Sequence, residues 1–452
     1  MPLKRLLSKV KRLSKNNHQF LFIKHSGIQL LSTGYVGAVS LGITILLARI
    51  LGVKEFGRYQ YALTIATFYA LLQDGGFRTL IFRERGAQTP EMAAYMKELF
   101  STQTPEDKLL IDLSLVHLIL TTLLGIVIIS FFPQSLLFAL AFIYYALFVL
   151  SNWLSAYLKG KGYFILDALW QATFRTTTAI SIVFFTIIIA THHQILTPEF
   201  PSSECVFLAS IIGAVIAFVF FVKERSLIKK INTIKFLTVN YPTILKRAFS
   251  IYHFSLPFLV IDFFTTIYFR FDLIIIGYLR GYKEAGLYAA VYRLIEGAIF
   301  IATPIMHILF QRLRVSWTDK MQFRKVFYRA LVVTIFVSIV ILCMGWGFST
   351  TIIDMIYGVA FINAELLLKY LFLALFFILP NYLLTQATIA LNKERFYAWT
   401  TVILALLNVG LNFWLVPSMG AKGAAVSTII TEACLFVIMG VGVRSYLAVG
   451  GL

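Results

Sequence analysis

The octet GVKEFGRY at Gly52–Tyr59 lies between two hydrophobic runs, and the octet GYKEAGLY at Gly281–Tyr288 lies between two others. The octets share the pattern GxKExGxY and are separated by about half of the 452-residue chain. A match of five residues in eight can arise by chance. The location of the two octets in the chain is therefore stronger evidence for a repeat than the shared residues are. A fainter pair, LKGKGYF from Leu158 and LNKERFY from Leu391, has nearly the same offset. Together the two pairs indicate an internal repeat.

The composition is that of a membrane protein. Hydrophobic residues make up 59% of the chain and charged residues 13%, against roughly 45–50% and about 25% in soluble domains. A membrane-spanning helix needs about 20 mainly apolar residues. Runs of this kind predict about twelve spans, at 27–51, 59–76, 109–132, 135–158, 164–190, 204–222, 251–279, 286–310, 327–349, 363–391, 397–416 and 423–443.

The expected fold class is therefore an all-α integral membrane protein. Its longest predicted loops, 77–108 and 223–250, hold about thirty residues, whereas independent domains begin near 50. A separate soluble catalytic domain is excluded on this ground.

Each octet lies between the first and second spans of one half, so six spans separate the copies. Because six is an even number, the two halves have the same orientation and are related by a pseudo-twofold axis along the membrane normal. Two parallel six-helix lobes that rock against each other are typical of transport proteins. The predicted organisation is a basic amphipathic N-terminal segment (1–26), an N-lobe (27–222), a basic cytoplasmic linker (223–250) and a C-lobe (251–452).

The formal net charge of +19 follows the same topology. Most of the 40 Lys and Arg residues fall in segments on one side of the predicted membrane, which places both termini in the cytoplasm by the positive-inside rule. The charge therefore does not indicate nucleic-acid binding. Segment 1–26 has the pattern of an amphipathic helix on an anionic leaflet; the alternative is that it only orients the first span.

Sequence motifs for catalysis, metals and cofactors are absent. The three cysteines, Cys205, Cys343 and Cys434, lie far apart in predicted spans, so neither a disulfide framework nor a CxxC pair is expected. There is no Walker loop, GxSxG or DxD motif. We expect no catalytic residues, no metal and no cofactor, which leaves a proton or sodium gradient as the energy source.

Ionisable residues inside spans are costly and usually face a cavity or a partner. Arg293 lies roughly 10 Å below the outer end of its span, beyond easy snorkelling. Glu296 is on the same helical face, so an intrahelical ion pair is one interpretation. Lys369 and Glu365 have the spacing of another such pair. Asp262 lies near the middle of the seventh span.

Two longer stretches resemble a known family. LARILGVKEFGRYQYALTIATFYALLQDGGFRTLIFRE at Leu47–Glu84 resembles the N-terminal signature of the polysaccharide transporter (Wzx-like) branch of the multidrug/oligosaccharidyl-lipid/polysaccharide (MOP) flippase superfamily. SLPFLVIDFFTTIYFRFDLIIIGYLRGYKEAGLYAAVYRLIEG at Ser255–Gly297 resembles its C-terminal counterpart. The chain departs from the fourteen-span arrangement of the peptidoglycan-precursor flippases in that superfamily.

The resemblance implies two six-helix lobes in a V shape that flip an undecaprenyl-diphosphate-linked oligosaccharide from the cytoplasmic to the outer leaflet of the bacterial inner membrane. Membrane lipid and other glycan-assembly proteins are the further partners it implies. Arg side chains suit bidentate binding of a diphosphate. We therefore expect the substrate cavity to be lined by Arg293, Arg49, Arg175, Arg270 and Lys369. The candidates for ion coupling are Asp262, Asp272 and Glu296.

Three alternatives remain open from the sequence. A multidrug or organic-cation exporter of the same superfamily would rely on carboxylates and aromatic residues, and aromatic runs such as Tyr144–Leu158 are present. A membrane enzyme acting on polyprenyl-linked sugars would need a large outer loop or a carboxylate cluster. A structural scaffold in a glycan-assembly complex is the third, and the charged residues within spans argue against it.

Overall fold

The structure is a computed structural model that describes residues 2–86, 107–131, 133–191, 202–223, 241–316 and 319–448. Residues 2–26 continue the first helix, whereas the side chains of segment 1–26 lie outside the described part, and with them its predicted amphipathic contacts. Most of the predicted linker, residues 224–240, also lies outside it. Helix α9 begins at Tyr241, ten residues before the predicted start of the C-lobe.

Every regular element in the described ranges is a helix. The N-lobe contains α1 (Pro2–Asp74), α2 (Phe77–Gly86), α4 (Asp107–Ser130), α5 (Ser135–Gly160), α6 (Phe164–Thr191) and α7 (Ser202–Lys223). The C-lobe contains α9 (Tyr241–Arg280), α10 (Tyr282–Val315), α11 (Lys320–Tyr357), the 3₁₀ helix η1 (Val359–Ala364), α12 (Glu365–Ala390), α13 (Glu394–Met419) and α14 (Ala421–Ala448). The predicted spans coincide with these helices, which confirms the all-α membrane fold class. Helix α2 was not predicted, because its sequence is too polar and too short for a span.

The first two predicted spans form one element, α1, which turns sharply at Gly52. Gly52 has φ 70° and ψ 173°, and Gly281, at the same position of the second octet, has φ 85° and ψ 176°. This region of backbone space is open essentially to glycine alone. The first glycine of each octet therefore makes the turn between two spans.

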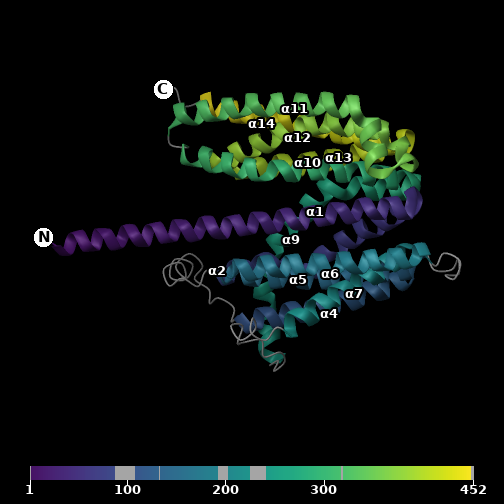
Figure 1. Ribbon diagram of the computed structural model, residues 1–452, viewed down its shortest axis with the longest axis horizontal. Coiled ribbons are helices and arrows are strands. Elements are labelled where there is room, and N and C mark those ends of the chain that lie inside the picture. Colours follow the sequence, from purple (N-terminus) through teal and green to yellow (C-terminus); the bar gives the residue numbers. More distant parts are fainter. Residues whose placement is uncertain are drawn as a thin grey trace.

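The helices form two bundles with the first half of α1 between them (Figure 1). Both chain termini lie at one end of the molecule, which we call the terminal end, and the turn of α1 lies at the other, which we call the octet end (Figure 1). This placement agrees with an even number of spans.

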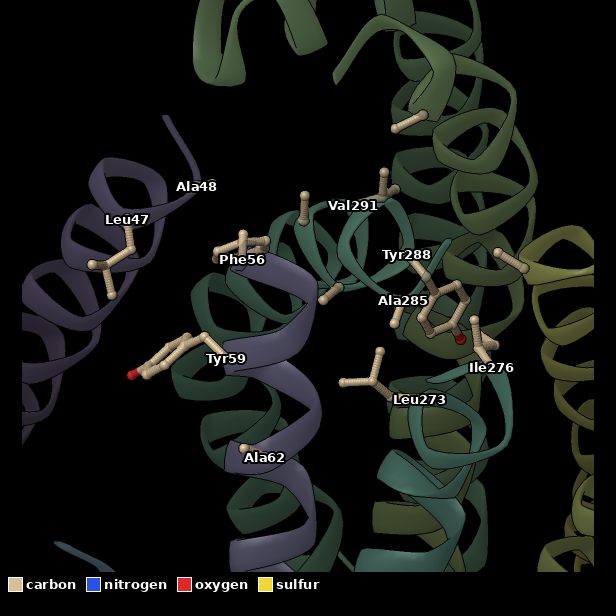
Figure 2. Packing of buried hydrophobic residues seen from close by; sticks show 14 of the residues in the cluster. Leu47, Ala48, Phe56, Tyr59, Ala62, Leu273, Ile276, Ala285, Tyr288 and Val291 are labelled. Carbon is tan, nitrogen blue, oxygen red and sulfur yellow. The ribbon is translucent and has the colours of Figure 1, made fainter. Parts of the chain in front are cut away.

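The two octets contact each other where α1 and α10 cross. A Cβ on Gly57 would collide with the carbonyl oxygen of Tyr282, and one on Gly286 would collide with the carbonyl oxygen of Val53. Gly57 and Gly286 occupy the same octet position, as do Val53 and Tyr282, so the crossing has the symmetry that the repeat predicts. Figure 2 shows the neighbouring apolar side chains packed around this crossing.

Two further seams join the lobes, and they are also related by the repeat. The first half of α1 meets α10, where Gly37 faces the ring of Phe300. The second half of α1 meets α9, where Phe68 lies edge-on to Phe271 at 6.2 Å and Gly277 faces the ring of Tyr61. The first contact joins the first predicted span to the eighth, and the second contact joins the seventh to the second. A pseudo-twofold axis that exchanges the two lobes makes these two pairs equivalent.

The glutamate of each octet anchors the sixth span of its own lobe. Glu55 accepts a hydrogen bond of 2.9 Å from Ser203 Oγ at the start of α7, and Glu284 accepts one of 2.8 Å from the backbone N–H of Ala421 at the start of α14. Helix N-termini have unsatisfied N–H groups and favour negative charge. The octet glutamates therefore have a structural role.

The octet tyrosines differ from expectation. Their position at a span end predicts amphipathic anchors at the membrane surface, but Tyr59 is 7% exposed and Tyr288 only 1%. Tyr288 donates a hydrogen bond to Asp272, and Tyr59 points toward the first half of α1, where Leu47 lies (Figure 2). Contacts within each lobe bury the two rings: Tyr59 packs against Phe207 of α7 with 4.9 Å between ring centroids, and Tyr288 against Tyr292 with 5.7 Å.

We predict that Gly57→Ala destabilises the closed octet end, because its methyl group would overlap a backbone carbonyl that cannot move independently of α10. Overpacking of this kind costs about 1–3 kcal/mol. The measurement is the rate of disulfide cross-linking between cysteines placed on α1 and α10 at the octet end. Gly42→Ala is the matched control, since a Cβ there meets no atom within 4 Å. Equal cross-linking rates in the two variants would contradict the role of the crossing.

We also predict that Glu284→Ala lowers thermal stability by about 0.5–2 kcal/mol, the usual cost of losing a helix cap. Lys283→Ala is the control, because the neighbouring Lys283 has no ion pair among the described residues. Melting of the purified proteins in detergent would compare them. A Glu284→Ala protein as stable as the control would show that α14 begins without help from the octet.

Candidate functional site

A cavity of about 290 Å³ lies where the lobes meet. Its walls come from both halves of α1, from α5, α6 and α7, and from α9 and α10 of the C-lobe. The turn at Gly52 allows this, because it folds α1 back so that Leu47 and Tyr59 line the same space. The cavity thus depends on the same glycine turn that organises the fold.

Three arginines reach this cavity from three helices: Arg175 of α6, Arg270 of α9 and Arg293 of α10. Glu296 bridges two of them, with 3.0 Å to Arg270 Nη2 and 2.6 Å to Arg293 Nη1. The intrahelical pair expected from the sequence is therefore present, and it extends to a second helix. The predicted ion-coupling residue Glu296 is placed as the partner of two predicted anion-binding residues.

Arg175 is different, because it has no carboxylate partner in the described part of the chain. Its guanidinium lies 5.1 Å from the ring centroid of Phe148, in a cation–π arrangement that leaves its N–H donors free of a counter-ion. Among the described residues, the carboxylates near these three guanidinium groups are Glu296 and, in an adjoining small pocket, Asp272, so positive charge is in excess. A cavity of this kind is suited to an anion.

Hydroxyl and amide groups line the rest of the cavity. Thr67 and Tyr145 share a hydrogen bond of 2.6 Å between α1 and α5, and Gln60 Oε1 accepts a long hydrogen bond of 3.4 Å from Arg293. Tyr144 and Tyr59 add two more phenol groups. Sequence reasoning noted the aromatic run that contains Tyr144 but missed Gln60 and Thr67, whose only signal is their nearness to the first octet.

Two predicted cationic residues lie elsewhere. Arg49 donates a hydrogen bond of 2.7 Å to the carbonyl of Ile356, and another to Met355, at the C-terminal end of α11. A cation there satisfies carbonyls that the helix leaves unpaired. Lys369 pairs with Glu365 at 2.6 Å, as its spacing predicts. Neither residue is among those that line this cavity.

Asp272 and Asp262 also have protein partners. Asp272 is buried, accepts a hydrogen bond of 2.7 Å from its neighbour Leu273 N, and accepts one from Tyr288. Asp262 pairs with Arg78 of α2 at 3.1 Å. Asp272 also lines a small pocket with Arg270 and Arg293 beside the main cavity, whereas Asp262 faces the N-lobe.

A second cavity of about 220 Å³ continues from the first toward the terminal end. The two share Thr67, Tyr145 and Phe148, and the second contains the Arg78–Asp262 ion pair that joins the lobes. Asp74, a lining residue that the sequence left without a role, accepts a 2.6 Å hydrogen bond from Trp153 Nε1. The cavities form a polar path along the lobe interface.

The family profile described as "Polysaccharide biosynthesis protein" matches residues 22–310. No curated protein matches the chain significantly in sequence. Among solved structures, an inward-facing multidrug resistance MATE family transporter of the MOP superfamily is similar at 12% identity and a TM-score of 0.60, covering 92% of this chain and 96% of that one.

Two further structures show the same likeness. The lipid II flippase MurJ in an inward closed conformation has 18% identity and a TM-score of 0.60, covering 93% of this chain and 87% of that one. A MOP superfamily transporter from Pyrococcus furiosus has 13% identity and a TM-score of 0.54, with 95% of each chain covered. The fold is thus that of MOP superfamily transporters, as the resemblance implied, and by its matched sequence the chain belongs to the polysaccharide biosynthesis protein family.

Proposed function

We propose that this protein is a flippase that moves undecaprenyl-diphosphate-linked glycan repeat units across the bacterial inner membrane. The observation that carries the proposal is the convergence of Arg175, Arg270 and Arg293 on one cavity between the lobes, where Glu296 pairs with two of them and Arg175 has no carboxylate partner within the described ranges. Support comes also from the family, which is described by polysaccharide biosynthesis, and from the fold likeness to a protein named as a lipid II flippase.

The chemistry of such a substrate matches the cavity lining. A diphosphate cannot enter hydrocarbon without counter-charges, and guanidinium groups bind phosphate oxygens bidentately. The hydroxyl of Tyr145 and the amide of Gln60 suit hydrogen bonding to the first sugar. The prenyl chain needs no polar route, because it stays in the bilayer while the head group crosses.

The size of the cavity requires motion. A volume of about 290 Å³ is at the small end of ligand sites, so a whole oligosaccharide enters only when the lobes separate. The octet crossing closes one end of the lobe interface, and the Arg78–Asp262 pair joins the lobes near the other. Opening the two ends in turn is alternating access. In this proposal both termini face the cytoplasm.

The energy source is part of the proposal. Asp262, Asp272 and Glu296 remain the candidates for coupling to a proton or sodium gradient, and other glycan-assembly proteins are candidate partners. Of the three, Glu296 is in direct contact with the cavity arginines. An incoming diphosphate would compete with it for the same guanidinium groups, which links substrate binding to the charge state of that carboxylate.

The rival function, export of organic cations, suits the same fold, since similar structures include multidrug transporters. The excess of arginine in the cavity favours an anion instead. A dye-efflux assay with cationic dyes separates the two: the flippase proposal expects no efflux above that of cells lacking the protein.

The decisive experiment is depletion of the protein in its own host, followed by quantification of lipid-linked oligosaccharide on each face of the inner membrane. We expect complete repeat units to accumulate on the cytoplasmic face. A normal distribution in a host with no second flippase would overturn the proposal, and unpolymerised glycan on the outer face would point to an enzyme.

We predict that Arg175→Gln lowers glycan export by about tenfold or more, because a hydrogen bond to a charged group is worth about 1.5–3 kcal/mol. Lys369→Gln is the matched control: it removes a cation from a span outside the cavity. Export is measured in cells at equal protein levels. Normal export by Arg175→Gln would contradict the anion site.

We further predict that Glu296→Gln lowers thermal stability by about 1–3 kcal/mol, because it leaves Arg270 and Arg293 without their carboxylate. Added inorganic diphosphate should restore more stability to this variant than to the wild type, since it supplies the missing negative charge. Glu365→Gln is the control, as it breaks a pair outside the cavity. Equal responses to diphosphate in all three proteins would show that the arginines do not bind it.

A further inference from the structure

A second site lies on the C-lobe, away from the lobe interface. A groove of about 540 Å³ runs between α11 and α14 near the terminal end and shares no residue with the central cavities. Helix α12 packs against both neighbours and forms the floor, where Leu384 is 1% exposed. The proposed transport does not use this groove.

The groove has a charged mouth and an apolar interior. Arg324 near the start of α11 and Arg444 near the end of α14 lie at the mouth. Phe327, Leu331 and Phe436 line the groove toward the middle of the helices. From Arg324 to Leu331, and from Arg444 to Phe436, the distance is about two helical turns, roughly 10 Å.

Neither arginine at the mouth has a carboxylate partner within the described ranges. Arg324 instead lies over the ring of Tyr328, with its guanidinium carbon 5.7 Å from the centroid. Two uncompensated guanidinium groups beside an apolar groove are complementary to a molecule that has an anionic head and a hydrocarbon chain.

The groove opens to the lipid-facing surface. Val332 of α11 and Val437 and Val441 of α14 lie near it with 60% or more of their surface exposed. Apolar side chains this exposed on a membrane helix contact acyl chains. An occupant can therefore enter sideways from the bilayer, and the arginines are at the end of the spans, where lipid head groups lie.

We infer that this groove binds one anionic glycerophospholipid, with its phosphodiester between Arg324 and Arg444 and an acyl chain along Phe327, Leu331 and Phe436. Basic pockets between transmembrane helices are known to hold acidic head groups in this way. The site is built into the C-lobe and does not depend on what the central cavity carries.

Gly440 permits a clean test. It lies between Phe436 and Arg444 on one face of α14 and lines the groove. A Cβ added at Gly440 meets no atom within 4 Å, so Gly440→Leu fills the groove without a backbone collision. Gly410→Leu is the matched control, because Gly410 is also helical, also has open space around its Cβ position, and lies on α13.

The experiment titrates the purified full chain, stripped of lipid, with phosphatidylglycerol and with phosphatidylcholine, and counts bound lipids by native mass spectrometry. We expect one phosphatidylglycerol to bind about tenfold more tightly than phosphatidylcholine, as two basic residues near the surface predict. Gly440→Leu and the double variant Arg324→Gln/Arg444→Gln should each lose this molecule, and Gly410→Leu should keep it.

Three results would overturn the inference. Equal binding of the two lipids would show that the arginines do not select charge. Retention of the tight phosphatidylglycerol by Gly440→Leu, with the fold confirmed by circular dichroism, would place the lipid elsewhere. Displacement of the lipid by undecaprenyl phosphate at much lower concentration would assign the groove to the transported substrate instead. Because the test measures lipid binding alone, its failure leaves the flippase proposal untouched.

Discussion

The crossing of Gly57 and Gly286 is the contact on which the rest of the structure depends. Two helix backbones approach so closely there that neither position tolerates a Cβ. This approach fixes where α1 and α10 lie, and so brings Tyr59 of one and Arg293 of the other to the same cavity. The repeated glycines are needed because, at this crossing, backbone atoms of the two lobes meet directly.

A cavity with an excess of arginine is a consequence of bringing the lobes together, because Arg175 comes from one lobe and Arg270 and Arg293 from the other. Like charges this close repel unless counter-charges are present. Glu296 supplies one, and it serves two arginines at once. Under the proposed function, the remaining imbalance favours closure of the lobes around an anion and so links occupancy of the cavity to lobe position.

The sequence predicted the fold well because hydrophobic length and an even-numbered repeat are properties of the chain alone. It identified Arg293 and Glu296 as a pair because they lie on one turn of helix. The sequence predicted Arg49 as a cavity residue and did not indicate Gln60. The surroundings of Arg49 are set by the end of α11, and those of Gln60 by the side chain of Arg293. Both contacts join segments that are distant in the sequence. The same holds for Glu432, whose hydrogen-bond partners Tyr268 and Asn381 come from two other helices and so cannot be recognised from the sequence around it.

The two closures of the lobe interface differ in kind. At the octet end, small residues allow close van der Waals packing of helix backbones, as is usual between membrane helices, and ring contacts such as Phe56 with Phe361 lie beside them. Near the terminal end, the Arg78–Asp262 pair has side chains 47% and 30% exposed, and exposed ion pairs are worth at most about 1 kcal/mol. Because the ion pair near the terminal end is weak, opening that end costs little free energy. A ligand of modest differential affinity can then shift the population from one state to the other, which is what a transporter built from two rocking lobes requires.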